Sequence, residues 1–317
     1  TGFSPNQNKN LFYDLKLNKR IILKIIDIRD YDKLKNFIKI TKPEIIFHLA
    51  AQPLVGVSYL KPIDTFNINF NGTLNILEIA RSFKFIKSVI AVTSDKCYED
   101  ANKTSGYKEN DKLGGVDPYS ASKAASELVV NSYYKSFFKE KNKCGISSVR
   151  AGNVIGGGDW STYRLIPDCI RHLLKNKTII LRNPHYNRPW QHVLEPLRGY
   201  LVLAKKQFEN PKKYSGAWNF GSNSKSIVSV KKIAELIIKF WGKGKIKTTN
   251  NRFYETKVLQ IDSAKAKKNL KWIPTYNITQ AVNITSDWYS DVEREKINPI
   301  NVTKLQISNY MLLNKKI

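Results

Sequence analysis

Short apolar runs rich in β-branched residues alternate along this chain with longer amphipathic stretches. Apolar runs without polar alternation are typical of strands that are buried on both faces of a parallel sheet. This pattern predicts strands over residues 20–28, 44–50, 88–94 and 145–154. The amphipathic stretches predict helices over residues 30–40, 64–83 and 118–138. Because strand and helix alternate, we predict an α/β fold with a doubly wound parallel sheet.

Beyond residue 158 the pattern is less regular and predicts a second, smaller lobe packed on the sheet. We expect residues 217–221 to return to the main sheet as a strand. The other expected elements are a helix beginning near Arg164, a short strand over 178–182, and helices over 196–206, 228–241, 263–270 and 278–292. The chain then divides into a sheet domain of residues 1–158 with 193–221, and a lobe of residues 159–192 and 222–317.

The net charge is +27, from 53 lysines and arginines against 26 acidic residues. Such a charge suits a polyanionic partner such as nucleic acid. The lysines are scattered singly or in pairs, however, and no dense basic run interleaves with aromatic residues. We therefore interpret the charge as a background bias of composition and expect no nucleic-acid partner.

Cysteine and histidine give no sign of a metal site. Cys97, Cys144 and Cys169 are widely spaced and form neither a metal-ligand spacing nor a disulfide framework. The four histidines share no zinc-ligand spacing. No apolar run reaches the length of about 18 residues that a membrane span needs. We expect no metal, no membrane span and a reducing, cytoplasmic location.

Tyr119 and Lys123 form a Tyr-x-x-x-Lys pair on the predicted helix that Asp117 can cap and Pro118 can begin. The i, i+4 spacing places both side chains on one helix face. A nearby ammonium lowers the pKa of a tyrosine from about 10, and such a phenol can remove a proton from a hydroxyl group. The pair alone also fits an ordinary helix face, because the spacing occurs often by chance.

The predicted strand over residues 88–94 ends at Ser94, and Asp95 and Lys96 follow it directly. Ligands of open α/β sheets bind at the carboxyl ends of the strands. A hydroxyl, an acid and a base at this edge, followed by the Tyr119 helix, predict one catalytic site. The alternative, a solvated ion pair between Asp95 and Lys96 in a loop, would contribute little.

Several motifs together resemble the CDP-glucose 4,6-dehydratase family, a branch of the extended short-chain dehydrogenases/reductases. They are TSDKCYE (93–99), GYKEND (106–111), LGG (113–115), DPYSASK (117–123), RAGNVIGGGDW (150–160), RLIPDCIR (164–171) and NPHYNRPWQHVLEPLRGY (183–200). Related dTDP-glucose enzymes carry Thr-Asp-Glu where this chain has Ser94, Asp95 and Lys96. The resemblance implies a Rossmann-type fold, NAD as cofactor, CDP-glucose as substrate and a place in deoxysugar biosynthesis.

In the reaction that the resemblance implies, Tyr119 takes the proton of the glucose 4-hydroxyl while hydride passes from C4 to NAD. Lys96 then removes the C5 proton and Asp95 protonates the departing C6 hydroxyl, so that water is lost. Hydride finally returns to C6. Ser94 would hydrogen-bond the 4-oxygen, and Lys123 would tune Tyr119.

The resemblance also implies two sets of binding residues. The NAD set is Asp27, Ile28, Leu49, Ala50, Ala51, Gln52, Asn69, Thr93, Tyr119 and Lys123. The substrate set is Ser94, Asn153, Arg164, Arg188, Gln191 and His192. Plainer interpretations stay open, because Asp27 could be a turn cap, the alanines could be core residues and Arg188 could form a surface salt bridge. We interpret the triple glycine at 156–158 as a flexible substrate loop, since no phosphate-loop spacing surrounds it.

One expected feature is missing from the sequence. The superfamily begins with a glycine-rich turn that holds the cofactor pyrophosphate, and no such turn is present near the start. By resemblance Thr1-Gly2-Phe3 falls near the end of the second strand, and Gly56-Val57 replaces a basic pair. We expect about one βα unit to be absent and NAD affinity to be reduced.

Three functions therefore stay open. The first is an NAD-dependent dehydratase, the second a related nucleotide-sugar 4-epimerase or decarboxylase, and the third a truncated, inactive nucleotide-sugar-binding homologue. By analogy with the extended family, we expect a homodimer formed through the helices over 64–83 and 118–138.

Overall fold

The computed structural model describes residues 9–101, 103, 105–140, 143–222, 226–249 and 260–314. The expectation for Thr1-Gly2-Phe3 lies outside these residues. Within them, four strands form one parallel sheet in the order β1-β2-β3-β8. The strands are β1 (Ile45–His48), β2 (Ser88–Val92), β3 (Gly145–Ala151) and β8 (Gly216–Phe220). The prediction of these four strands, and of the return of the chain at β8, is confirmed.

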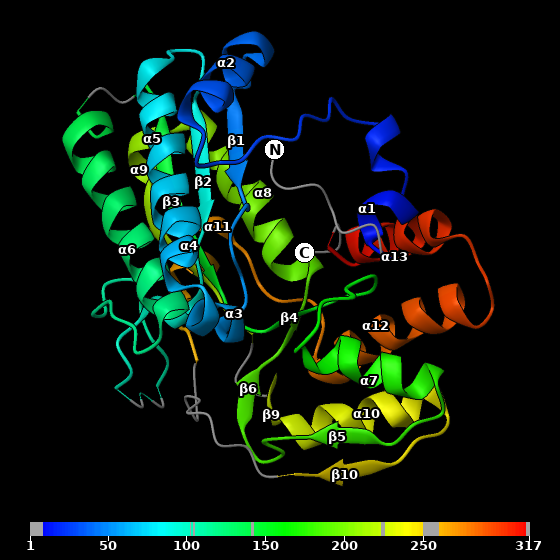
Figure 1. Ribbon diagram of the computed structural model, residues 1–317. Coiled ribbons are helices and arrows are strands. Elements are labelled where there is room, and N and C mark those ends of the chain that lie inside the picture. The colour runs from blue at the N-terminus through cyan, green and yellow to red at the C-terminus, as the bar shows by residue number, and fades with distance from the viewer. Residues whose placement is uncertain are drawn as a thin grey trace.

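Helices cover both faces of this sheet (Figure 1). Val89 and Ala91 of β2 belong to a core with α2 (Tyr31–Thr41), α5 (Gly72–Ser82) and α6 (Pro118–Tyr133). Ile90, between them, belongs to a second core with α8 (Leu194–Glu209) and α11 (Ala264–Leu270). Since successive strand side chains point to opposite faces, β2 is buried on both sides. The predicted doubly wound α/β fold is confirmed.

Some elements differ from their predicted bounds, and others were not predicted. The predicted helix over 64–83 consists of α4 (Pro62–Phe66), a π-turn η2 (Asn67–Asn71) and α5, and α6 continues into a second π-turn η4 (Tyr134–Phe138). The unpredicted elements are α1 (Leu11–Asp14), η1 (Leu17–Lys19), α3 (Val55–Leu60), η3 (Asp95–Cys97), β4 (Val154–Ile155), β6 (Asn187–Pro189), β7 (Gln191–His192), α9 (Pro211–Tyr214), β9 (Ile227–Ser229), β10 (Ile246–Thr248) and α13 (Pro299–Asn314).

The predicted strand over residues 20–28 is wrong. Among the described residues this stretch forms no strand: only Ile26 makes a single β-bridge, and Ile22 is 82% exposed. Ile21 and Ile25 are exposed as well. A β-branched run becomes a strand only where a neighbouring strand pairs with several consecutive residues, and here a single residue is bridged.

A smaller lobe lies at one end of the sheet (Figure 1). Its apolar core joins α7 (Leu165–Leu174), α10 (Val230–Trp241) and α12 (Ile278–Glu293) to the short parallel pair β5 (Ile179–Leu181) and β10 (Ile246–Thr248). The helices predicted beyond residue 222 are present, although α10 begins two residues later than expected. The assignment of α11 to the lobe is wrong, because Ala266 and Leu270 pack into the core of the sheet domain. None of the described helices has the length and apolarity that a membrane crossing requires.

The triple glycine at 156–158 is a packing feature, so its interpretation as a flexible loop is wrong. A Cβ on Gly157 would lie 2.1 Å from the Trp288 ring, and one on Gly156 would lie 2.8 Å from Val193. Gly158 has φ +76°, a conformation that favours glycine. These three glycines let the chain pass directly against Trp288 of α12, Val193 at the start of α8 and Leu11 of α1.

Candidate active site

A single 3₁₀ turn, η3 (Asp95–Cys97), follows β2 and carries the predicted acid and base. Ser94 caps this turn, since its Oγ accepts a hydrogen bond from the Lys96 amide at 3.2 Å. The same hydroxyl donates to Asp95 Oδ1 at 3.0 Å. Burial raises the pKa of Asp95, although Lys96, Ser94 and Arg188 oppose the shift. The turn thus presents a carboxyl group whose protonated form is stabilised, beside a half-buried lysine.

Tyr119 and Lys123 lie in the first two turns of α6, directly beside this turn. Ser94 acts to lower the pKa of Tyr119, yet burial dominates and raises this pKa to about 12. Lys123 Nζ donates to the Val92 carbonyl at 3.1 Å, and burial lowers its pKa to about 8. The expectation that Lys123 lowers the pKa of Tyr119 is wrong for this structure, because burial dominates and the ammonium is directed to the end of β2.

The two predicted substrate arginines lie beside these catalytic side chains. Arg164 precedes α7, and its charge acts to lower the pKa of Tyr119. Arg188 lies on β6, and its charge acts to lower the pKa of Asp95. The structure therefore brings two guanidinium groups from the smaller lobe to the end of β2. Guanidinium groups are suited to bind phosphate oxygens in a forked geometry.

Asn153, Gln191 and His192 lie together where β4 pairs with β7. The Asn153 carbonyl accepts a hydrogen bond from the Gln191 amide at 3.0 Å. Gln191 Oε1 and His192 Nε2 are buried and have no hydrogen-bond partner among the described residues. Burial lowers the pKa of His192 to about 4, so its ring is neutral near pH 7. His192 Nδ1 accepts from the Leu194 amide, so the neutral ring carries its hydrogen on Nε2. A buried acceptor and a buried donor without partners are unusual in folded proteins, and a bound ligand can satisfy both.

The loop from Leu49 to Gln52 follows β1 and is fixed by Asn69, which lies in the π-turn η2. Asn69 Oδ1 accepts from the Gln52 amide at 2.8 Å, and its Nδ2 donates to the Gln52 carbonyl at 3.1 Å. The same Nδ2 donates to Ser122 Oγ at 2.9 Å, so the loop is tied to α6. Single π-turns are frequent at functional sites. These contacts give Asn69, which was expected to bind NAD, a structural role in holding the loop.

Three predicted NAD residues make contacts within the protein. The Thr93 hydroxyl donates to Glu127 and to the Val149 carbonyl inside the sheet domain. Asp27 accepts from the Arg29 guanidinium at 2.7 Å and from its amide at 2.9 Å, and Arg29 lowers the pKa of Asp27. The Asp27 carboxylate therefore acts as a turn cap here, while the Ile28 side chain packs against Gly72.

The residues present fit the nicotinamide and ribose half of NAD. Tyr119 and the buried ammonium of Lys123 supply hydrogen-bonding groups at the carboxyl edge of the sheet. The braced loop beside them carries the small residues Ala50 and Ala51, which allow a ligand to approach the backbone. Lys123 and Tyr119 are the groups that would hold the ribose and the reacting end of the cofactor.

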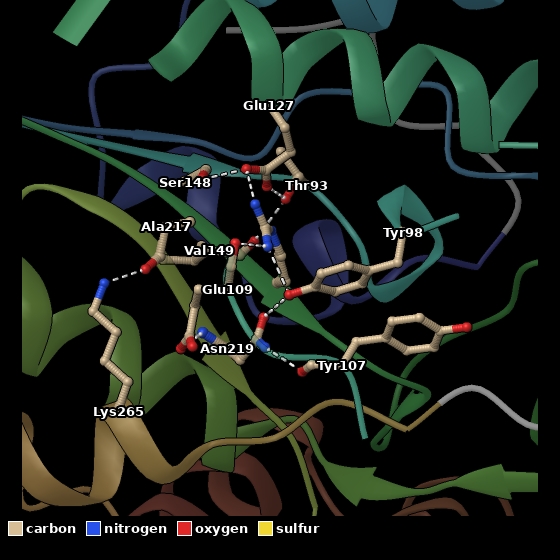
Figure 2. A network of polar contacts seen from close by, with 11 residues as sticks. Thr93, Tyr98, Tyr107, Glu109, Glu127, Ser148, Val149, Ala217, Asn219 and Lys265 are labelled. Atoms are coloured by element: carbon tan, nitrogen blue, oxygen red, sulfur yellow. Dashed lines mark hydrogen bonds and ion pairs between the residues drawn. The ribbon is translucent and has the colours of Figure 1, made fainter. Parts of the chain in front are cut away.

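Sequence reasoning missed a buried polar network directly below the catalytic turn. Figure 2 shows Glu127, Thr93, Tyr98 and Asn219 joined by hydrogen bonds. At its centre Arg150 pairs with Glu127 at 2.5 Å, and both side chains are only 2% exposed. Two signals were available in the sequence. Glu127 follows Lys123 at i+4, and Arg150 interrupts an otherwise uncharged buried strand.

Comparison with known proteins now adds to this geometry. Residues 3–285 match the family model described as GDP-mannose 4,6 dehydratase. The chain belongs to this family. Within the wider set of relatives, it is 42% identical over 308 residues to CDP-glucose 4,6-dehydratase of Salmonella typhimurium, covering 95% of this chain and 86% of the relative. The resemblance drawn from the motifs is confirmed.

Solved structures with the same fold include enzymes of different activity. A dTDP-glucose 4,6-dehydratase from Bacillus anthracis, in complex with NAD, matches with a TM-score of 0.72 at 24% identity, over 87% of this chain and 81% of the other. A UDP-glucuronic acid 4-epimerase from Bacillus cereus, in complex with UDP-glucuronic acid and NAD, matches with a TM-score of 0.75 at 22% identity, over 89% and 85%. The fold is therefore of the Rossmann type, and fold alone does not separate dehydratase from epimerase.

Proposed function

We propose that this chain is an NAD-dependent nucleotide-sugar 4,6-dehydratase that converts CDP-glucose to CDP-4-keto-6-deoxyglucose. One observation carries the proposal: Asp95 and Lys96 lie on a turn that packs against α6, the helix of Tyr119, and Ser94, which caps this turn, acts to lower the pKa of Tyr119. Oxidation at C4 needs only a base such as Tyr119, whereas loss of water from C5 and C6 needs a further acid and base. The site holds candidates for both tasks.

The site residues divide the reaction between them. Lys123 and Tyr119 would hold NAD, which would supply the hydride acceptor for C4 and the hydride donor for C6. Tyr119 takes the proton of the 4-hydroxyl. The resulting 4-keto group makes the C5 proton acidic, so that Lys96 can remove it. Asp95 gives its proton to the C6 hydroxyl, which leaves as water.

The product then needs one hydrogen at C6 and one at C5. As hydride returns to C6, the protonated Lys96 gives its proton back to C5, so the sum of the steps is the loss of one water. Burial favours the protonated form of Asp95 before each turnover, which suits a general acid. Ser94 holds the 4-oxygen between Tyr119 and the turn.

The two parts of the chain have separate roles in this proposal. The sheet domain, residues 1–158 with 193–221, binds NAD through the edge that carries Leu49 to Gln52 and Lys123. The lobe of residues 159–192 and 222–317 binds the nucleotide sugar. Arg164 and Arg188 bind its diphosphate, and Asn153, Gln191 and His192 surround the rest of the ligand. The unsatisfied Gln191 Oε1 and His192 Nε2 support this placement.

A related 4-epimerase is the second candidate function, because the Tyr119 and Lys123 pair would serve it equally well. The acid and base on η3 favour elimination over simple return of hydride to C4. The presence of Ser94, Asp95 and Lys96 on one turn that packs against the helix of Tyr119 argues against an inactive homologue.

CDP-glucose is expected to be the preferred substrate over dTDP-glucose and UDP-glucose. The support is the 42% identity to a CDP-glucose enzyme over 95% of the chain. Steady-state kinetics with added NAD should give a kcat/KM for CDP-glucose at least about tenfold above the others, which corresponds to about 1.4 kcal/mol of differential binding. Equal values for the three would remove the cytidine preference and keep the reaction class. A 4-epimerised product without loss of water would support the second candidate.

We also propose a homodimer formed through α4, α5 and α6. Ile63 and Phe66 of α4 and Leu128 of α6 are exposed apolar side chains, as are Tyr59 and Leu60 of α3 and Phe137 of η4. Exposed apolar side chains that gather on one face mark interaction sites. Sedimentation equilibrium should give twice the 36.4 kDa chain mass, and Leu128→Asp should shift the protein to monomer.

Leu312→Asp on α13 is the matched control for that substitution. Leu128 is 59% exposed and Leu312 is 58% exposed, so the two changes place a charge at equally accessible positions on different faces. The control variant should stay dimeric. A wild-type monomer, or dissociation by Leu312→Asp alone, would contradict the assigned face.

A further inference from the structure

The catalytic turn is held at both ends by the same buried ion pair. At its start, the Thr93 hydroxyl donates to Glu127. At its end, the Tyr98 hydroxyl accepts a hydrogen bond from Arg150 at 2.6 Å. Glu127 and Arg150 are themselves paired at 2.5 Å. The residues on either side of the turn that carries Asp95 and Lys96 therefore both bind the Glu127–Arg150 ion pair.

The two charged groups are fixed by further contacts. Glu127 also accepts from Ser148 Oγ at 2.6 Å, and Arg150 also donates to the Glu109 carbonyl at 3.1 Å. The Arg150 guanidinium lies 4.8 Å from the centre of the Tyr98 ring. Tyr98 in turn donates to Asn219 Oδ1 at 2.8 Å, as Figure 2 shows. Because Glu127 and Arg150 each have several partners, their side chains are held in one position and can in turn hold the catalytic turn in place.

The same pair is connected to the oxidising side chains. Tyr119, Lys123 and Glu127 follow one another at intervals of four on α6 and share one helix face. Glu127 thus lies in one row with the two residues that act at C4, and it binds the turn whose residues act at C5 and C6. Glu127 therefore connects the residues proposed for oxidation, Tyr119 and Lys123, to the turn that carries the residues proposed for elimination.

Stability alone is a poor explanation for this ion pair. Burying two charges carries a desolvation cost that often matches or exceeds their attraction, and apolar replacements of such pairs are often more stable. Because the Glu127–Arg150 pair costs free energy to bury and contacts both ends of the catalytic turn, we look for a role beyond stability.

We propose that Glu127 and Arg150 are positioning residues, which hold Asp95 and Lys96 in register with Tyr119 and Lys123. This inference rests on the proposed dehydratase function. Neither residue touches the substrate; they act through Thr93 and Tyr98. Loosening either connection should slow the elimination more than the oxidation, because the turn would shift while Tyr119 remains on its helix.

Tyr98→Phe is the direct test, because it removes one hydroxyl and retains the ring and the ion pair. We expect kcat on CDP-glucose to fall about tenfold or more, as for a lost hydrogen bond to a charged group, while KM changes less than about twofold. In a single turnover, the absorbance of reduced nicotinamide should rise before product appears. Amide hydrogen exchange at residues 94–98 should become faster.

Tyr310→Phe is the matched control. Its hydroxyl is also buried between an arginine and a carboxylate, donating to Glu195 at 2.7 Å and accepting from Arg198 at 3.0 Å. This variant should lose similar thermal stability and keep kcat. If both variants lose kcat in proportion to their melting temperatures, or if Tyr98→Phe keeps wild-type turnover and exchange, the positioning role is wrong.

Thr93→Val tests the other end of the turn and covers the case in which Tyr98→Phe does not fold. It should reproduce the accumulation of reduced nicotinamide, whereas Thr285→Val, which removes a buried hydroxyl from α12, should not. Wild-type protein without dehydratase activity on any nucleotide-glucose would contradict the proposed function alone. Unchanged exchange at residues 94–98 in both turn variants would contradict the positioning role by itself.

Discussion

Replacing Tyr119 by Phe should reduce turnover on CDP-glucose by about 10²- to 10⁴-fold, the usual contribution of a positioned acid–base group. The substitution removes the hydroxyl group and leaves the ring in its buried position. Without this base the 4-hydroxyl proton has no acceptor, so the first oxidation itself should fail. Rapid mixing with CDP-glucose and NAD should then show no rise in reduced-nicotinamide absorbance.

Tyr133→Phe on the same helix provides the comparison for this result. Its hydroxyl contacts Glu78 at 3.2 Å, far along α6 from the turn. This variant should keep wild-type turnover. Wild-type turnover in Tyr119→Phe, with the fold intact by circular dichroism, would remove Tyr119 from the mechanism.

Replacing Lys96 by Ala should give the opposite pattern of partial reactions. The oxidation at C4 should proceed, because Tyr119 and Lys123 are unchanged, and the loss of water should slow by about 10²- to 10⁴-fold. Reduced nicotinamide should therefore accumulate to a large fraction of the enzyme sites, and deuterium from solvent should not enter C5 of the bound sugar. Single-turnover absorbance and mass spectrometry of the sugar measure these two quantities.

Lys112→Ala distinguishes a loss of the base from a general loss of positive charge. Lys112 pairs with Glu99 at 3.0 Å and its side chain is 77% exposed, so its removal should change neither partial reaction. If Lys96→Ala forms product at the wild-type rate, Lys96 is only a surface charge and another group must take the C5 proton.

The pattern of apolar residues was sufficient to predict the sheet and its helices, because a strand such as β2 is buried on both faces and leaves a continuous apolar run. The same reasoning failed for residues 20–28. Ile21, Ile22 and Ile25 satisfy the pattern of a strand, yet a strand exists only where another strand pairs with it. Pairing is a property of the folded chain and leaves no local signal.

In the candidate site, too, residues with a local sequence signal were predicted and residues that only the fold brings together were not. Tyr119, Asp95 and Lys96 were found from their spacing and from the strand end that precedes them. Glu127 and Arg150 were missed, because they lie on a helix and a strand that only the fold brings together. Strand position alone also does not decide whether the Thr93 hydroxyl faces a ligand or the protein interior; the acceptor groups on Glu127 and Val149 decide it.

The middle of the catalytic turn also contains sulfur. Cys97 is fully buried between the two anchored ends, and burial raises the pKa of its thiol well above the usual range. Only the thiolate reacts readily with alkylating agents or peroxide. Cys97 can therefore be modified only during moments in which the turn leaves its place and water enters. The rate at which a thiol reagent labels Cys97 therefore reports how often the turn opens. Cys97 is thus a natural probe of the stability of the turn that carries Asp95 and Lys96.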